Sequence, residues 1–276
     1  MTAQSQPSPL AGVSIVWIAS LITAAIIAGA SIAGIVYQAS IYPGETLRRW
    51  FVLNDAVNLA AGLPLLLGSL WLARRGRLIG LLCWPGALFY VLYVYTGYLI
   101  AVPFGALFPA YLALVALSAY TLIGLGASID GRAVRERLDG RIPARTIGGI
   151  LLGLAVLTIL RQVATIIGAL AAPSSVTAQT LASWIADLAV MCPALLITGI
   201  QMWQRKPLGY VAGPGLLLQF GVLALGLIPG LALQSPADAA GMVIVAVMAV
   251  ICLVPFALLV RAAAAGERPV ELSDGL

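Results

Sequence analysis

The sequence predicts an all-α integral membrane protein, a polytopic bundle of about eight transmembrane helices. Hydrophobic residues make up 62% of the 276 positions and charged residues only 9%, whereas soluble domains are roughly half apolar and one quarter charged. A spanning helix needs roughly 20 mostly apolar residues. A chain of this length therefore has room for about eight spans with short connections and for no sizeable soluble domain. Any function is expected to lie within the helix bundle.

Apolar stretches separated by charged, glycine-containing or proline-containing breaks define the spans. The first is expected to be retained rather than cleaved, because no basic segment precedes it and its apolar run is too long for a signal peptide. Short connections after the second, third, sixth and seventh spans predict tight antiparallel hairpins. The expected spans are 12–37, 52–73, 78–100, 104–126, 147–171, 180–203, 207–232 and 239–261.

Basic residues are concentrated on one side of the predicted bundle. The opposite side carries only Arg48 and Arg49, and one further cation, Arg161, lies within the fifth span. The positive-inside rule then places both termini in the cytoplasm. The arginine-rich and alanine-rich composition points to a prokaryotic source, so the expected location is the cytoplasmic membrane. The cations on the basic side are Arg74, Arg75, Arg77, Arg132, Arg135, Arg137, Arg141, Arg145, Arg205, Lys206, Arg261 and Arg268.

The longest connection, an arginine-rich segment at 128–146, divides the chain into halves of four spans each, 1–127 and 147–276. Its mixed charges are typical of a solvated link or a short surface helix. With four spans between copies, an internal 4+4 repeat would be parallel, with its axis along the membrane normal. Chance similarity is the alternative, because proline and glycine are common in membrane helices. At an offset of 129 residues the coincident pairs are Pro64 and Pro193, Gly80 and Gly209, Pro85 and Pro214, Gly86 and Gly215, Gly97 and Gly226, and Asn58 and Asp187.

Ionisable residues inside membrane spans are the best indication of a site, because burying them in lipid is costly. Arg161 and Asp187 lie at depths that differ by about one helical turn on either side of the same connection, so they can pair. Other polar side chains gather toward the same leaflet from the second and third spans. The candidate site residues are Arg161, Asp187, Gln162, Asn58, Asp55, Tyr93 and Tyr98.

Two interpretations of this cluster remain open. In one, the side chains line a cavity that opens to the outside, with Arg161 offering a planar cation and Asp187 an acceptor to a ligand. In the other, the pair only fixes the packing of two helices. Asp55 lies close enough to the interface to pair with Arg48 and Arg49 or to snorkel toward headgroups. The tyrosines equally suit an interfacial aromatic belt or ordinary packing.

The composition excludes several kinds of chemistry. Without histidine, the chain cannot supply bis-histidine haem ligation, a histidine–metal catalytic site or a serine–histidine dyad. Its three cysteines fall in three different spans and show neither zinc spacing nor a disulfide framework. We therefore expect no cofactor, no metal, no nucleic acid and no enzymatic activity. An aspartyl enzyme would require Asp55 and Asp187 to be neighbours.

The leading expectation is a carrier-like or ligand-binding protein with a polar cavity in its extracytoplasmic half, for a small amphiphile, a lipid or an anion. Besides the lipid bilayer, a small molecule or lipid would then be its ligand. The alternative is a membrane scaffold or sensor subunit that does not transport. Such a subunit would bind a protein partner through the cytoplasmic 128–146 connection.

Overall fold

A computed structural model describes residues 10–232 and 238–265, which form helices and short connections without any strand. Eight helical segments are long and apolar enough to cross a membrane, which confirms the predicted all-α polytopic bundle. The second span consists of α3, η1 and α4, and the sixth of α9, η3 and α10. The helices are α1 (Leu10–Val36), α2 (Gln38–Ile41), α3 (Glu45–Val57), η1 (Asn58–Gly62), α4 (Leu63–Arg74), α5 (Leu78–Ala101), α6 (Phe108–Ser128), α7 (Gly131–Leu138), α8 (Ala144–Leu170), η2 (Pro173–Ser175), α9 (Ala178–Ile185), η3 (Ala186–Met191), α10 (Cys192–Trp203), α11 (Pro207–Ala232) and α12 (Ala239–Ala265).

Helix boundaries follow the sequence prediction closely except at the second span, which begins at Glu45 rather than at residue 52. Gly44 precedes it with a φ of 85°, a conformation that favours glycine. Glu45 then lies in the first turn, where a negative charge suits the helix dipole. These first turns also carry Arg48 and Arg49, so their hydropathy is too low to mark them as part of a span.

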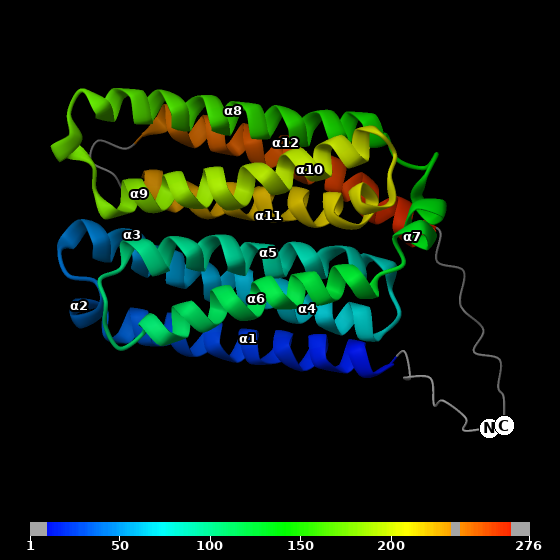
Figure 1. The fold of residues 1–276 in the computed structure, drawn as a ribbon, viewed down its shortest axis with the longest axis horizontal. Coiled ribbons are helices and arrows are strands. Elements are labelled where there is room, and N and C mark those ends of the chain that lie inside the picture. Colours follow the sequence, from blue (N-terminus) through cyan, green and yellow to red (C-terminus); the bar gives the residue numbers. More distant parts are fainter. Residues whose placement is uncertain (1–9, 233–237, 266–276) are drawn as a thin grey trace, which may run out of the picture.

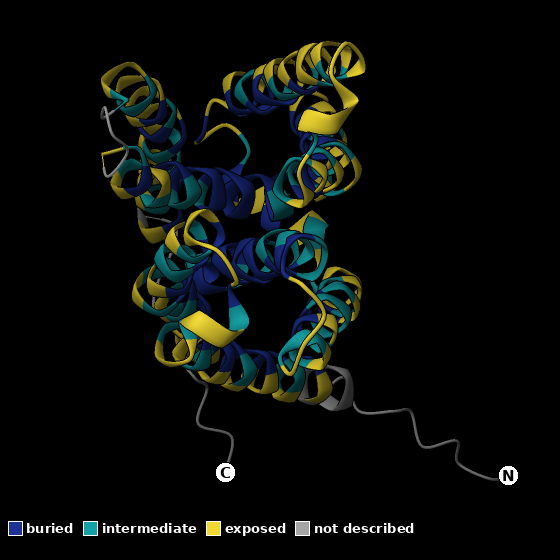
Figure 2. Ribbon diagram, turned by 90° about the vertical axis from the view of Figure 1, so that its left-hand side faces the viewer, coloured by how far each residue is buried: buried dark blue, intermediate teal, exposed yellow. Residues whose placement is uncertain are grey.

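The helices form two layers. One contains α1 to α6 and the other α8 to α12, with α5 and α11 packed against each other where the layers meet (Figure 1). Buried positions gather in this central region, and exposed positions cover the outside (Figure 2). We call the end of the bundle that holds α7 and the connections 75–77 and 204–206 the basic end. The connections 102–107 and 171–177 lie at the opposite end (Figure 1).

The two layers meet through a glycine contact. A Cβ atom on Gly215 would lie 2.7 Å from the backbone nitrogen of Gly86, and one on Gly86 would overlap the backbone of Gly215. Small residues let membrane helices approach backbone to backbone in this way. Gly86 and Gly215 are separated by the 129-residue offset, so equivalent positions of the two halves contact each other, as they would across a twofold axis.

Other features share this offset. α4 and α10 begin and end at equivalent positions, and each follows a π-helical turn. The connection after each of them has a positive φ at the same place, 70° at Gly76 and 54° at Arg205. The halves also differ, since α6 packs along α1 whereas α12 makes few contacts with α8. The 4+4 repeat stays a prediction, and these correspondences support it.

The 128–146 connection contains the short helix α7, fixed to the basic end of the bundle. The Asp130 side chain caps it by accepting from the backbone N–H of Arg132 at 2.9 Å. Val134 and Leu138 are buried, and the helix packs on α11. Just after α7, the Tyr210 hydroxyl donates to Asp139 at 2.6 Å, and Arg205 lies 3.7 Å from the same carboxylate.

This anchor predicts a pH-dependent contribution to stability. The hydrogen bond from Tyr210, followed by the nearby Arg205 and Arg135 cations, lowers the pKa of Asp139 below its usual range. A lowered pKa in the folded state stabilises the protein above the unfolded pKa, and this stabilisation is lost as the pH falls through the folded pKa. Wild type should therefore melt at a higher temperature than Asp139→Asn at pH 7, and the difference should shrink below about pH 4.

Thermal unfolding in detergent as a function of pH measures this difference. Glu136→Gln, on the exposed side of α7, is the matched control. It should melt as wild type does, both at pH 7 and below about pH 4. A constant gap between wild type and Asp139→Asn at all pH values would contradict the assignment.

Candidate functional site

A cavity of about 460 Å³ lies between the two layers and is the candidate ligand site. Five elements form its wall: α3 and α5 from the first half, and α9, η3 and α11 from the second. It lies toward the end of the bundle opposite the basic end, since it includes Ala101 at the end of α5 and Gln179 at the start of α9. The lining residues are Trp50, Phe51, Asn54, Val57, Tyr90, Tyr93, Val94, Gly97, Tyr98, Ala101, Gln179, Ala182, Ser183, Ala186, Leu223, Gly226 and Leu227.

Most of this wall consists of equivalent positions in the two halves. Like the glycine contact between α5 and α11, the cavity therefore lies between positions that the predicted repeat would make equivalent, and it lies farther toward the opposite end of the bundle. The lining pairs at the 129-residue offset are Trp50 and Gln179, Asn54 and Ser183, Val57 and Ala186, Val94 and Leu223, Gly97 and Gly226, and Tyr98 and Leu227.

The wall is aromatic and uncharged. Its polar groups are the tyrosine hydroxyls, two amides, the Ser183 hydroxyl and the Trp50 indole N–H, and no charged side chain lines it. Within the described part of the chain, the side chains of Asn54 and Gln179 form no hydrogen bond. An apolar cavity with a few free polar groups is the usual form of a small-molecule site. Asn54 and Gln179 are therefore the groups most available to a ligand.

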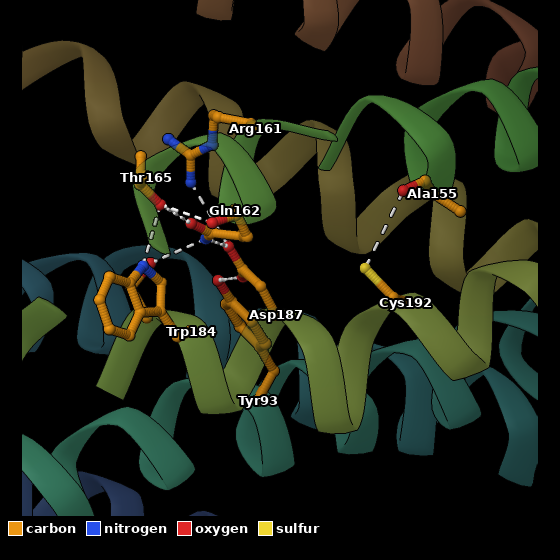
Figure 3. Close-up of polar contacts among 9 residues, drawn as sticks. Tyr93, Ala155, Arg161, Gln162, Thr165, Trp184, Asp187 and Cys192 are labelled. Atoms are coloured by element: carbon orange, nitrogen blue, oxygen red, sulfur yellow. Dashed lines mark hydrogen bonds and ion pairs between the residues drawn. The ribbon is translucent and has the colours of Figure 1, made fainter. Parts of the chain in front are cut away.

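Asp187 lies directly behind one tyrosine of this wall (Figure 3). The Tyr93 hydroxyl donates to Asp187 Oδ1 at 2.7 Å, and the Gln162 amide donates to Oδ2. The same amide nitrogen lies 3.1 Å from Ser183 Oγ, and Ser183 also lines the cavity. Asp187 thus orients the wall of the cavity without being part of it.

The expected pairing of Arg161 with Asp187 is present, with Arg161 Nη2 at 3.4 Å from Asp187 Oδ2. The two side chains differ in environment, since 66% of the Arg161 side chain is exposed against 5% of that of Asp187. Arg161 approaches the carboxylate from the outer surface of α8, on the side away from Tyr93 (Figure 3). It does not line the cavity, so a ligand there would not meet a cation.

Asp55 forms a second cluster, in the first half. It accepts from the Tyr42 hydroxyl at 2.7 Å and from the Tyr98 hydroxyl at 3.0 Å. The alternative that Asp55 pairs with arginines at the interface or snorkels is wrong, because its residue surface is only 1% exposed. Asp55 follows Leu47 and Phe51 at four-residue steps on the buried face of α3, which turns it toward the protein interior.

Asn58 holds a third tyrosine of the wall. The Tyr90 hydroxyl donates to Asn58 Oδ1 at 2.8 Å, while the Asn58 amide donates to Tyr95 at 3.4 Å. Tyr90, Tyr95 and Tyr98 are buried, so they do not form an interfacial belt. Three of the predicted side chains, Asp55, Asn58 and Asp187, therefore each bind the hydroxyl of a different cavity tyrosine.

Of the seven candidate residues, only Tyr93 and Tyr98 line the cavity. Asp55 and Asp187 have separate hydrogen-bond partners and share none among the described residues. The residues predicted from the sequence did not include Trp50, Gln179 or the lining residues of α11. The 129-residue offset could have found Leu227, because its first-half equivalent is the candidate Tyr98.

Comparisons with protein-family models, with curated proteins and with solved structures give no match for this chain. The class of protein defined by its fold is a polytopic membrane protein of eight spans.

Proposed function

We propose that this protein is a carrier-like, ligand-binding membrane protein whose site is the cavity between its two halves. The observation that carries the proposal is that most of the cavity wall consists of residue pairs at the 129-residue offset, with tyrosines held in place by buried acceptors. Transporters built from repeats bind their substrates at the interface between the repeats. Movement of one half against the other would then open and close the cavity.

Orientation follows from the distribution of charge. Apart from Arg48, Arg49 and Arg161, the described cations lie at the basic end. By the positive-inside rule, the basic end belongs in the cytoplasm and the cavity in the extracytoplasmic half. The proposed location is the cytoplasmic membrane of a prokaryote.

The wall favours an uncharged amphiphile among the expected ligands. An apolar or aromatic body would stack on Trp50, Phe51 and the tyrosines, and a hydroxyl or amide group would bind Asn54 or Gln179. An anion would gain little, because Arg161 lies outside the cavity. In this proposal Tyr93 and Tyr98 contact the ligand, while Asp187, Asp55 and Asn58 position the wall.

Filling the cavity provides the test. Gly97 lines it, and a Cβ atom there would meet no other atom within 4 Å, so Gly97→Phe should place a ring in the cavity without disturbing the wall. The probes are straight-chain alcohols and the fatty-acid anions of the same length, added to protein in lipid nanodiscs. An alcohol that binds should raise the melting temperature of wild type. At 100 times its Kd, the alcohol should raise the free energy of unfolding by about 2.7 kcal/mol. Gly97→Phe should abolish this rise.

The control is Gly153→Phe, the same change at an exposed glycine of α8 that also has no atom within 4 Å. It should respond to the alcohols as wild type does. If Gly97→Phe retains the full response, the ligand binds elsewhere and the cavity is not the site.

The scaffold alternative has its own supporting observation. Arg132, Arg135 and Arg137 are exposed on α7, while the opposite face of this helix is fixed to the bundle by Val134, Leu138 and the Asp139 anchor. A rigid, basic cytoplasmic helix suits an acidic protein partner. This alternative gains weight if none of the alcohols or anions stabilises wild type.

A further inference from the structure

Asp55 is a buried carboxyl group without a cation. Its residue surface is 1% exposed, and it forms no ion pair within the described residues, where the two ion pairs are Arg161 with Asp187 and Arg205 with Asp139. It lies ten residues, or about 15 Å, along the span from Glu45. An ionised carboxylate at such a place is costly, and the cost is far smaller when the group binds a proton.

The groups around Asp55 leave little room for a counter-ion. A Cβ atom on Gly34 of α1 would lie 2.6 Å from the Tyr42 hydroxyl and would overlap Asp55 Oδ2, so the carboxyl group packs directly against the α1 backbone. The ionisable groups that face it from the other elements are tyrosines: Tyr90, Tyr95 and Tyr98 of α5, Tyr111 of α6, and Tyr42, which precedes α3. On α3 itself, Arg48 and Arg49 lie nearer the start of the helix and form no ion pair with Asp55.

Each tyrosine that binds Asp55 has a second acceptor within reach. The Tyr98 hydroxyl lies 3.0 Å from Asp55 Oδ1 and 3.2 Å from the carbonyl oxygen of Phe51. The Tyr42 hydroxyl lies 2.7 Å from Asp55 Oδ2 and 3.5 Å from the Tyr111 hydroxyl. Because a hydroxyl rotates freely and both donates and accepts, the same heavy-atom positions support two hydrogen-bond patterns.

We propose that Asp55 is a proton-binding site, built so that Tyr42 and Tyr98 satisfy both of its protonation states. In the ionised state, both tyrosine hydroxyls donate to the carboxylate. On protonation, one proton binds to Oδ2, and the new O–H group donates a hydrogen bond to the Tyr42 oxygen. The Tyr42 hydroxyl then turns to Tyr111, while Tyr98 continues to donate to Oδ1 or turns to Phe51. One proton is taken up, and no bond other than O–H is formed or broken.

This site borders the proposed ligand cavity, because Phe51 and Tyr98 belong to both. Proton binding at Asp55 nevertheless does not depend on the cavity's having a ligand, so the two proposals fail independently.

Infrared spectroscopy of the full chain in lipid nanodiscs tests the proposal directly. A protonated carboxyl group has its own C=O stretching band, which a carboxylate lacks. Wild type should show such a band that disappears reversibly as the pH is raised. Asp55→Asn should lose the band, because asparagine has no carboxyl group that could bind the proton, whereas Glu45→Gln, which changes an exposed acid at the start of the same helix, should keep it.

A band that persists in Asp55→Asn, or its absence from wild type at every pH at which the protein stays folded, would overturn the proposal. Should Asp55→Asn fail to fold, Tyr42→Phe provides the second measurement, because it removes one donor and leaves the carboxyl group in place. It should change the pH at which the band disappears. An unchanged titration in Tyr42→Phe would equally overturn the assignment of the band to Asp55.

Discussion

Asp187→Ala should destabilise the protein by on the order of 3 kcal/mol, and by clearly more than Arg161→Ala does. Both variants break the ion pair at 3.4 Å. Only Asp187→Ala also leaves the Tyr93 hydroxyl without its acceptor and removes one of the two acceptors of the Gln162 amide, which keeps Ser183. A buried donor left without a partner costs about 1–3 kcal/mol, whereas an ion pair with an exposed partner contributes only about 0–1 kcal/mol.

Thermal and denaturant unfolding of the two alanine variants in the same detergent measures the comparison. Tyr93→Phe is the matched control for a single lost hydrogen bond and should fall between wild type and Asp187→Ala. Equal destabilisation by Arg161→Ala and Asp187→Ala would instead show that the ion pair alone holds the cluster. The comparison therefore separates an interhelical ion pair from a carboxylate that orients the cavity wall.

Gly86→Ala is the second variant from which we expect a large effect. The added methyl group would overlap the backbone of Gly215. Because the atoms that it meets belong to the backbone, they cannot move aside as the end of a flexible side chain can. Overpacking of a tight contact typically costs about 1–3 kcal/mol, and the upper part of this range applies where backbone meets backbone. Because this contact joins the two halves, its loss should also move the walls of the cavity apart.

Gly153→Ala is the control for this change. It adds the same methyl group to an exposed position of α8 with no atom within 4 Å. Replacing glycine by alanine in a helix without strain stabilises by about 0.4–1 kcal/mol, so the two variants should shift the melting temperature in opposite directions. If Gly86→Ala is as stable as wild type, the close approach of α5 and α11 is not required for the fold.

The cavity also bears on whether the Arg161–Asp187 pair is a binding site or a packing device. Arg161 is outside the wall, and Asp187 contacts the cavity only through Tyr93 and through the Gln162 contact with Ser183. The arrangement supports a positioning role for Asp187. That Arg161 and Asp187 themselves bind a ligand stays a prediction, and it gains no support from the lining of the cavity, which includes neither residue.

The sequence by itself determined the helices and their ends. A bilayer requires each span to be long, apolar and hydrogen-bonded within itself, and these local demands are readable in hydropathy, proline and charge. They located seven of the eight spans to within about four residues and missed the start of the second span, where charged residues occupy the first turns of α3. The concentration of cations in the even-numbered connections, and the regular offset between halves, are equally local patterns.

Tertiary structure alone decided which polar side chains meet. Tyr93 and Asp187 are 94 residues apart, and Tyr98 and Asp55 are 43 apart; which of several polar groups at one depth become neighbours depends on how α5 packs between α3 and α9. Sequence spacing gives the depth of a residue and the face of its own helix, but not the neighbour that this face contacts. For that reason Arg161 could be paired with Asp187 from the sequence, while its position outside the cavity, and the burial of Asp55 among tyrosines, could not be predicted.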